Sequence, residues 1–247
     1  MTARPIVGGL GFLLLSTSLL FLFFVILSAV RDNTPLNRTY FLEADTSGIS
    51  GARDTTRWTY FHICNERNLD CWGPWPAPAF GWAWGADPDN APDGLAGSRG
   101  GRTTSHYYFY LWRFSWVFYM MALFFIALAW FSSFLACCGR LGSAIAALLS
   151  SIGLFFLTLA VPLMTVTFVK ARDAFHAAGR DAHLGVYGFA FSWASWAALF
   201  IATLLFCIGI RGRDDSHTRR GWGRRSKSTR SRRSYEAGNR RVKDDYS

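Results

Sequence analysis

The chain has 247 residues, of which 51% are hydrophobic and 17% aromatic, and its formal net charge is +10. Four long apolar segments occupy so much of this length that no separate soluble domain fits beside them. What remains is one loop of some size, two short connections and a polar tail.

The apolar segments cover residues 6–30, 114–137, 143–169 and 186–210, and none of them contains Asp, Glu, Lys, Arg or His. Each exceeds the roughly 20 residues that a helix needs to cross a hydrocarbon core about 30 Å thick. Backbone polar groups in lipid must be satisfied within the segment or by closing a barrel, and continuous apolar runs fit helices. The sequence therefore predicts an all-α membrane protein, in which residues 1–210 form a four-helix transmembrane bundle.

A cleavable signal peptide is the alternative interpretation of residues 6–30. Arg4 precedes this run, and the small residues Ser28 and Ala29 lie near its end. The apolar part of a signal peptide usually has about 7 to 15 residues, and this run is much longer. Its length favours a membrane span.

The loop of residues 31–113 carries two marks of an extracellular location. Asn37 begins the glycosylation sequon Asn37-Arg38-Thr39, which is used only on the lumenal or extracellular side. Cys64 and Cys71 are the only cysteine pair outside the helices and their ends, and a disulfide between them suits an oxidising compartment. Both marks place this loop outside and both termini in the cytoplasm, whereas the basic residues near the helix ends favour this orientation only weakly.

Two alternatives to the disulfide stay open at this point. Cys64 and Cys71 would be free thiols in one, and zinc ligands together with His62 in the other. A structural zinc site has four ligands, and the sequence offers no clear fourth.

Two parts of this loop have a recognisable local pattern. Residues 57–64 are rich in aromatic and β-branched side chains, which predicts one or two strands or a small β cap. Residues 72–82 combine prolines, which forbid a regular interior strand, with several tryptophans. We expect this second segment to lie on the outer membrane interface.

Small residues at a spacing of four predict where the helices approach one another closely, as they do in lipid. Two such stripes occur, in the fourth and third apolar segments: Ala190, Ala194, Ala198 and Ala202, and Ser143, Ala147 and Ser151. Pro162 removes one backbone hydrogen bond from the third helix and predicts a structural bend there.

The tail, residues 211–247, holds 13 basic and 5 acidic residues, a net charge of +8. It is too polar to build a core, which predicts disorder. Beside a bilayer it is expected to bind the anionic inner leaflet rather than nucleic acid. Ser226 and Ser234, flanked by arginines, are candidate phosphorylation sites, and the juxtamembrane pair Cys137 and Cys138 is a candidate palmitoylation site.

The residue types that carry catalysis do not gather in this sequence. The five histidines are scattered over the loops and tail, and no carboxylate lies within the apolar segments. A Gly-rich phosphate loop and a nucleophile elbow are both missing from the sequence. We therefore expect a protein that is not an enzyme and needs no cofactor or metal. Because the spans carry no charge, a pore or transporter is also disfavoured.

A set of short motifs follows the predicted spans in a fixed order. The first loop contains Arg57-Trp58-Thr59, then Cys64 and Cys71, then Pro78-Ala79-Phe80, and Arg172-Asp173-Ala174-Phe175 follows the third span. In these motifs the chain resembles the fungal Sur-seven/PalI family of four-span plasma-membrane proteins over roughly its first 210 residues. The tryptophan followed by a cysteine pair is also similar to the claudin-like pattern of an extracellular cap.

The resemblance implies a non-enzymatic organiser of the plasma membrane in eisosome-associated cortical domains, linked to cell-wall integrity, cortical organisation and sporulation. Cortical scaffold proteins and a second copy of the chain are the partners that it implies. The other branch of the family implies an alternative, a membrane adaptor in ambient-pH sensing that stabilises a receptor.

Overall fold

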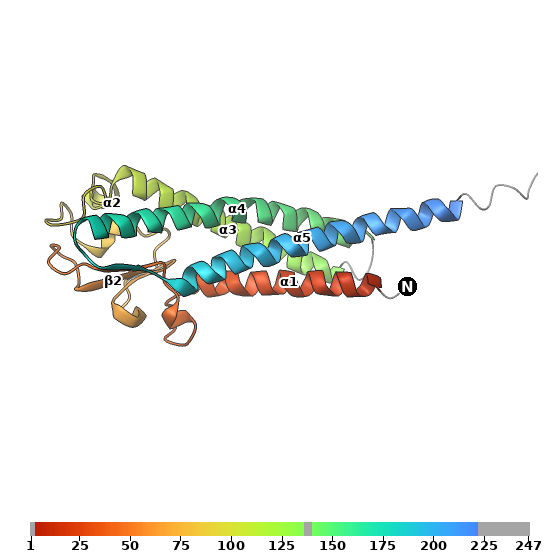
Figure 1. Cartoon of the computed structure of the whole chain (residues 1–247), viewed down its shortest axis with the longest axis horizontal. Helices are drawn as coiled ribbons and strands as arrows, with labels where there is room; N and C mark the ends of the chain where they lie inside the picture. The colour runs from red at the N-terminus through yellow and green to blue at the C-terminus, as the bar shows by residue number, and fades with distance from the viewer. Residues whose placement is uncertain (1–2, 136–139, 222–247) are drawn as a thin grey trace, which may run out of the picture.

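The computed structural model describes residues 3–135 and 140–221, and its main feature is a bundle of four long helices (Figure 1). Each of the four contains an apolar stretch long enough to cross a membrane, which confirms the predicted bundle. The helices are α1 (Ala3–Ile26), α3 (His106–Leu135), α4 (Arg140–Ala177) and α5 (Val186–Gly221).

The helices do not end where the apolar runs end. α1 stops at Ile26 because Ala29 takes a left-handed backbone conformation, with φ of 62°. α3 begins eight residues before residue 114, and α4 runs eight residues past residue 169. Residues 211–221 were predicted to belong to a disordered tail, but they continue α5 as helix. This stretch has no proline, and extending an existing helix does not require the costly nucleation of a new one. The rest of the tail lies outside the described residues.

A small head, residues 27–105 and 178–185, covers one end of the bundle, opposite the N-terminus (Figure 1). It contains a four-stranded antiparallel sheet in the order β3-β2-β1-β4. The strands are β1 (Leu42–Asp45), β2 (Thr55–Trp58), β3 (Ile63–Cys64) and β4 (Ala182–Leu184), and the short helices are η1 (Leu36–Arg38), η2 (Glu66–Asn68), η3 (Phe80–Ala83) and α2 (Arg99–Arg102).

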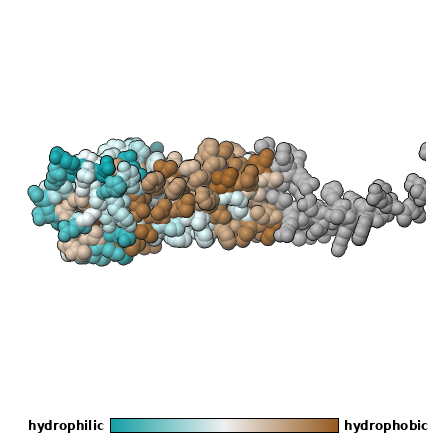
Figure 2. Space-filling view, turned by 90° about the horizontal axis from the view of Figure 1, so that it is seen from above, coloured by the Kyte–Doolittle hydropathy of each residue, from teal (hydrophilic) through white to brown (hydrophobic). Residues whose placement is uncertain are grey.

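The predicted strands at residues 57–64 are confirmed as the end of β2 and as β3. β4 was not predicted: it comes from the connection between α4 and α5, and it pairs with β1, so that Leu42 faces Leu184. Both loops at this end of the bundle therefore build one sheet. Figure 2 shows hydrophilic residues over the head and hydrophobic residues over the helices.

The helices form a ring in which α1 packs on α3 and α5, and α4 packs on the same two. Deep between α1 and α5, Ser18 and Ser195 are fully buried, and their hydroxyl oxygens lie 2.9 Å apart. Between α3 and α4, a Cβ on Gly153 would lie 2.8 Å from Ile126, so this glycine allows a close approach. Small side chains thus let these helices meet, as lipid packing requires.

The predicted small-residue stripes are only partly correct. Ala198 and Ala202 are buried on α5, but Ala190 is exposed, and the buried face runs instead through Ser192 and Ser195. On α4, Ala147 is buried and Ser151 is exposed, while the side chain of Ser143 lies outside the described set. α4 is continuous through Pro162, and the predicted bend stays a prediction.

The start of α5 and the residue before it lie against the backbone that leads into β1. A Cβ placed on Gly188 would lie 2.4 Å from the carbonyl oxygen of Tyr40, and one on Gly185 would lie 1.9 Å from it. The Gly185 N–H donates to the carbonyl of Phe41 over 3.0 Å. α5 therefore enters the bundle directly beneath β1.

We expect Gly188→Ala to destabilise the protein by about 1 to 3 kcal/mol, because the new methyl group must push the Tyr40 backbone away. Gly9→Ala is the matched control, since nothing lies within 4 Å of a Cβ at that position of α1. Urea unfolding of both variants in a mild detergent, followed by circular dichroism, measures the difference. Equal stability of the two variants would contradict the close approach.

Candidate functional site

The head is joined to the bundle by a cluster of aromatic rings around Trp58. This side chain is fully buried at the end of β2, and its Nε1–H donates to the carbonyl of Phe80 over 3.1 Å. Its ring centroid lies 5.8 Å from that of Phe80, 5.8 Å from that of Phe175 and 6.3 Å from that of Trp84. The three partners come from η3, the end of α4 and the residue after η3.

The same cluster continues into the bundle. Phe80 stands edge to face with Trp112 of α3 at 4.6 Å, and Trp112 packs on Phe168 of α4 at 4.6 Å. Phe168 in turn stacks on Phe41 of the head at 5.0 Å. We call this set the aromatic junction; it consists of Phe41, Trp58, Phe80, Trp84, Trp112, Phe168 and Phe175.

The later part of the segment of residues 72–82 is buried in the head, while residues 72–74 and 76 are exposed, and a location on the outer membrane interface stays a prediction. Phe80, Ala83 and Trp84 are buried, and Trp84 donates its Nε1–H to the carbonyl of Thr103 over 3.0 Å. Trp72, with 38% of its surface exposed, is the most open tryptophan of this segment. Trp82 and Trp84 fill the head, because their N–H groups find carbonyl partners within it, at Gly100 and Thr103.

The two other residues of the Arg57-Trp58-Thr59 motif support the sheet. Arg57 forms an ion pair with Glu43, its cross-strand neighbour, and its guanidinium lies 4.5 Å from the centre of the Tyr40 ring. Burial, followed by the charge of Glu43, raises the pKa of Tyr40. Thr59 closes the β2–β3 turn: its hydroxyl donates to the carbonyl of His62 over 2.9 Å and accepts the His62 N–H.

This turn also inserts Tyr60 between α3 and the residues that follow α1. The Tyr60 hydroxyl donates to the carbonyl of Trp116 on α3 over 2.8 Å, and its backbone N–H donates to the Ser28 hydroxyl just after α1. Burial raises the pKa of Tyr60 well above its usual value, so the hydroxyl keeps the proton that it donates.

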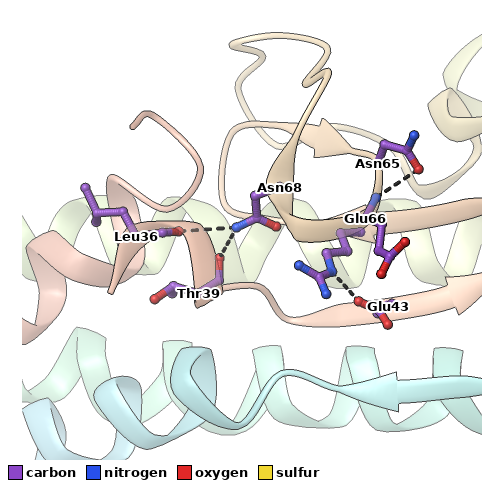
Figure 3. Close-up of polar contacts among 7 residues, drawn as sticks. Leu36, Thr39, Glu43, Asn65, Glu66 and Asn68 are labelled. Carbon is purple, nitrogen blue, oxygen red and sulfur yellow. Dashed lines mark hydrogen bonds and ion pairs between the residues drawn. The ribbon is translucent and has the colours of Figure 1, made fainter. Parts of the chain in front are cut away.

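Cys64 and Cys71 form the predicted disulfide, with their Cα atoms 4.0 Å apart. The closed loop carries Asn68, whose buried amide donates to the carbonyls of Leu36 and Thr39 over 3.2 Å each (Figure 3). Asn65 begins η2 by accepting the Glu66 N–H. The disulfide loop therefore holds the first turn of the head, η1, through one side chain that the sequence analysis did not single out.

The alternative of a zinc site does not agree with the structure, since both sulfur atoms are joined to each other. His62 is half-buried, and burial lowers its pKa. Among residues 3–135 and 140–221, no group of three or more His, Cys, Asp and Glu side chains is arranged to hold a metal ion.

The predicted modification sites are not brought together. Asn37 lies in η1 and donates to Asp32 over 3.3 Å, and its glycosylation stays a prediction. Cys137, Cys138, Ser226 and Ser234 lie outside the described residues. Cys207 is exposed on α5.

A shallow hollow on the outer side of the sheet gathers several polar groups, namely Glu43, Asp45, Thr55, Asp181 and His183. Glu43 is already paired with Arg57. Asp45 accepts the backbone N–H of Ser47 over 2.9 Å. Hydrogen bonding from the Ser47 side chain, followed by that from the Ser47 backbone, lowers the pKa of Asp45. Two of the three acids that line this hollow, Glu43 and Asp45, are thus engaged in local contacts of the sheet.

The fold and junction define a four-span membrane protein with a disulfide-containing head. A family model described as the SUR7/PalI family matches residues 7–205, so the chain belongs to the SUR7/PalI family. The SUR7 family protein FMP45 of Saccharomyces cerevisiae is 34% identical over 217 residues, which cover 82% of this chain and 69% of the relative.

Two further relatives agree with this membership. Protein SUR7 of Candida albicans is 34% identical over 201 residues, covering 79% of this chain and 71% of the relative. The Uncharacterized plasma membrane protein YNL194C of S. cerevisiae is 32% identical over 207 residues, covering 81% of this chain and 66% of the relative. None of these three names describes an enzyme.

We expect Trp58→Ala to cost about 3 to 5 kcal/mol of stability, because it empties the centre of the aromatic junction. Trp72→Ala, which removes a partly exposed tryptophan of the same head, should cost less than about 1 kcal/mol. Urea unfolding followed by near-UV circular dichroism measures both. A loss for Trp58→Ala no larger than for Trp72→Ala would contradict the role given to the junction.

Replacing Asn68 tests the link between the disulfide loop and η1. Its φ is 57°, so Asn68→Ala combines backbone strain with the loss of two hydrogen bonds, whereas Asn68→Gly removes only the bonds. We expect Asn68→Gly to cost about 1 to 3 kcal/mol, since two carbonyls lose their donor. Unfolding in urea, with Gly48→Ala as a control for strain at a left-handed residue, separates the two effects. Unchanged stability of Asn68→Gly would show that the amide does not hold η1.

Proposed function

We propose that this SUR7/PalI-family protein is a non-enzymatic organiser of plasma-membrane domains, associated with eisosomes. In this role it supports cell-wall integrity, cortical organisation and sporulation. The observation that carries the proposal is the aromatic junction, which joins the head to α3 and α4 in one continuous core. A head fixed to its bundle in this way suits a static structural unit. The family membership and a relative named as a plasma membrane protein support the location.

In the proposed orientation the head lies outside the cell and both termini lie in the cytoplasm. The sequon at Asn37 and the disulfide of the head support this choice, because both belong to an oxidising, glycosylating compartment. The basic tail then meets the anionic inner leaflet and the cortical scaffold proteins. Phosphorylation at Ser226 and Ser234 would lower its positive charge and loosen that contact, and acylation at Cys137 or Cys138 would strengthen it.

We expect the fluorescently tagged full chain, expressed in S. cerevisiae, to form immobile patches that coincide with a cortical scaffold marker. Recovery after photobleaching measures its mobility. Trp58→Ala should give fewer or more mobile patches, because it separates head from bundle, and Trp72→Ala should leave the patches unchanged.

Diffuse, freely recovering fluorescence of the unmodified chain would contradict the structural role. If, in addition, deletion of the gene in its own host abolished growth at alkaline pH, the adaptor in ambient-pH sensing would be the better description.

A further inference from the structure

The turn between β2 and β3, residues 59–62, fastens the head both to α3 and to the residues that follow α1. The Tyr60 N–H donates to the Ser28 hydroxyl over 3.2 Å, and the Tyr60 hydroxyl donates to the carbonyl of Trp116 over 2.8 Å. Phe61 stands edge to face with Trp116 at 5.7 Å. We call this segment the Tyr60 turn. None of these residues belongs to the aromatic junction, which reaches the bundle through α3 and α4.

His62 ends this turn with a buried ring nitrogen. Its Nδ1 is shielded from solvent and has no hydrogen-bond partner among the residues that the structure describes. The ring packs on the segment after the disulfide, where a Cβ on Gly73 would lie 3.3 Å from its Cδ2. In an imidazolium both ring nitrogens carry a proton. Protonation of His62 would therefore bury a charged N–H donor that meets neither water nor an acceptor, which is unfavourable.

The surroundings of His62 do not neutralise such a charge. Within residues 3–135 and 140–221, no carboxylate lies within 4.0 Å of the His62 ring nitrogens. Burial lowers the pKa of His62, and hydrogen bonding with the Ser28 backbone opposes this effect only in part. The titratable and charged residues on the segments around the ring are Tyr60, Cys71 in the disulfide, Arg31 and Asp32 after α1, Arg53 over the Trp72 ring, and Arg113 on α3.

We propose that His62 is an acid-sensitive latch, whose protonation releases the Tyr60 turn from Ser28 and Trp116 while the aromatic junction keeps the head attached to α3 and α4. The Thr59 hydroxyl bonds both the N–H and the carbonyl of His62, so the ring reaches water only when the turn moves as a unit. The latch responds to the solution on the side of the head. This inference goes beyond the proposed function and does not depend on it.

The direction of the pH dependence follows from the burial of the ring. The open turn takes up a proton more readily than the closed turn, because its imidazole is solvated. Closure is therefore fully favoured above pH 6.5, the ordinary pKa of histidine, and is progressively lost as the pH falls below this value.

Hydrogen–deuterium exchange of the full chain in bilayer discs tests the latch, because a segment that opens locally loses amide protection. Exchange is measured at about pH 5 and about pH 8, on either side of the ordinary histidine pKa. Each rate is divided by the intrinsic rate of a free peptide at the same pH. We expect the amides of residues 59–63 to lose protection about fivefold at the lower pH, while those of β1 change little.

Two variants remove the titrating group. His62→Gln cannot be protonated, so its turn should be equally protected at both pH values. His62→Phe keeps a flat ring without nitrogens and should behave in the same way, which guards against misfolding of the first variant. His183→Gln is the matched control, since it removes an exposed histidine from the same head and should retain the response of the unmodified chain.

Equal protection of residues 59–63 at the two pH values would overturn the proposal. So would a pH response that persists in His62→Gln or His62→Phe, or one that disappears in His183→Gln. A loss of protection that spreads equally over β1 would mean that acid unfolds the whole head rather than releasing the turn, and the proposal would fail in that case too.

Discussion

The packing of Trp58 against Phe80 and Phe175 is the contact on which the rest of the head depends. Phe175 lies on α4, so this contact joins the first loop to the end of a membrane helix. A short hairpin such as β2–β3 is at best marginally stable alone in water, and three or more strands with a buried face are needed. The sheet reaches four strands only because β4 arrives from the second loop. Head and bundle therefore stabilise each other through one core.

Within the membrane a different balance applies, because lipid tails are as apolar as the side chains that pack there. Helix contacts then depend on close approach and on hydrogen bonds. Gly153 allows a close approach between α3 and α4. The buried Ser18–Ser195 pair provides hydrogen bonding between α1 and α5. Each serine hydroxyl also lies 2.9 Å from the other residue's carbonyl oxygen. The outward side chains, such as Phe131 and Leu148, remain exposed because they face lipid.

The bundle and the disulfide could be predicted from the sequence. An uncharged run of more than 20 residues fits few structures other than a membrane helix, and an isolated cysteine pair in an exported loop usually forms a disulfide. The small-residue stripe on α5 failed for a geometric reason. Residues four apart rotate by about 40° around a helix at each step, so Ala190 and Ala202 lie roughly 120° apart. β4 could not be predicted because three residues are too few to establish an alternating pattern, and its pairing with β1 decides its conformation. The role of Asn68 and the burial of Trp84 could not be predicted either, because their hydrogen-bond partners, Thr39 and Thr103, are distant in sequence.

The motifs that carry the family resemblance lie mostly inside the protein. Trp58, Phe80 and Phe175 belong to the aromatic junction, and Cys64 is buried in the disulfide. Such residues specify how the head is built and attached, and they are unavailable to a partner. A binding partner must therefore meet the exposed surfaces of the head and bundle rather than these motif residues.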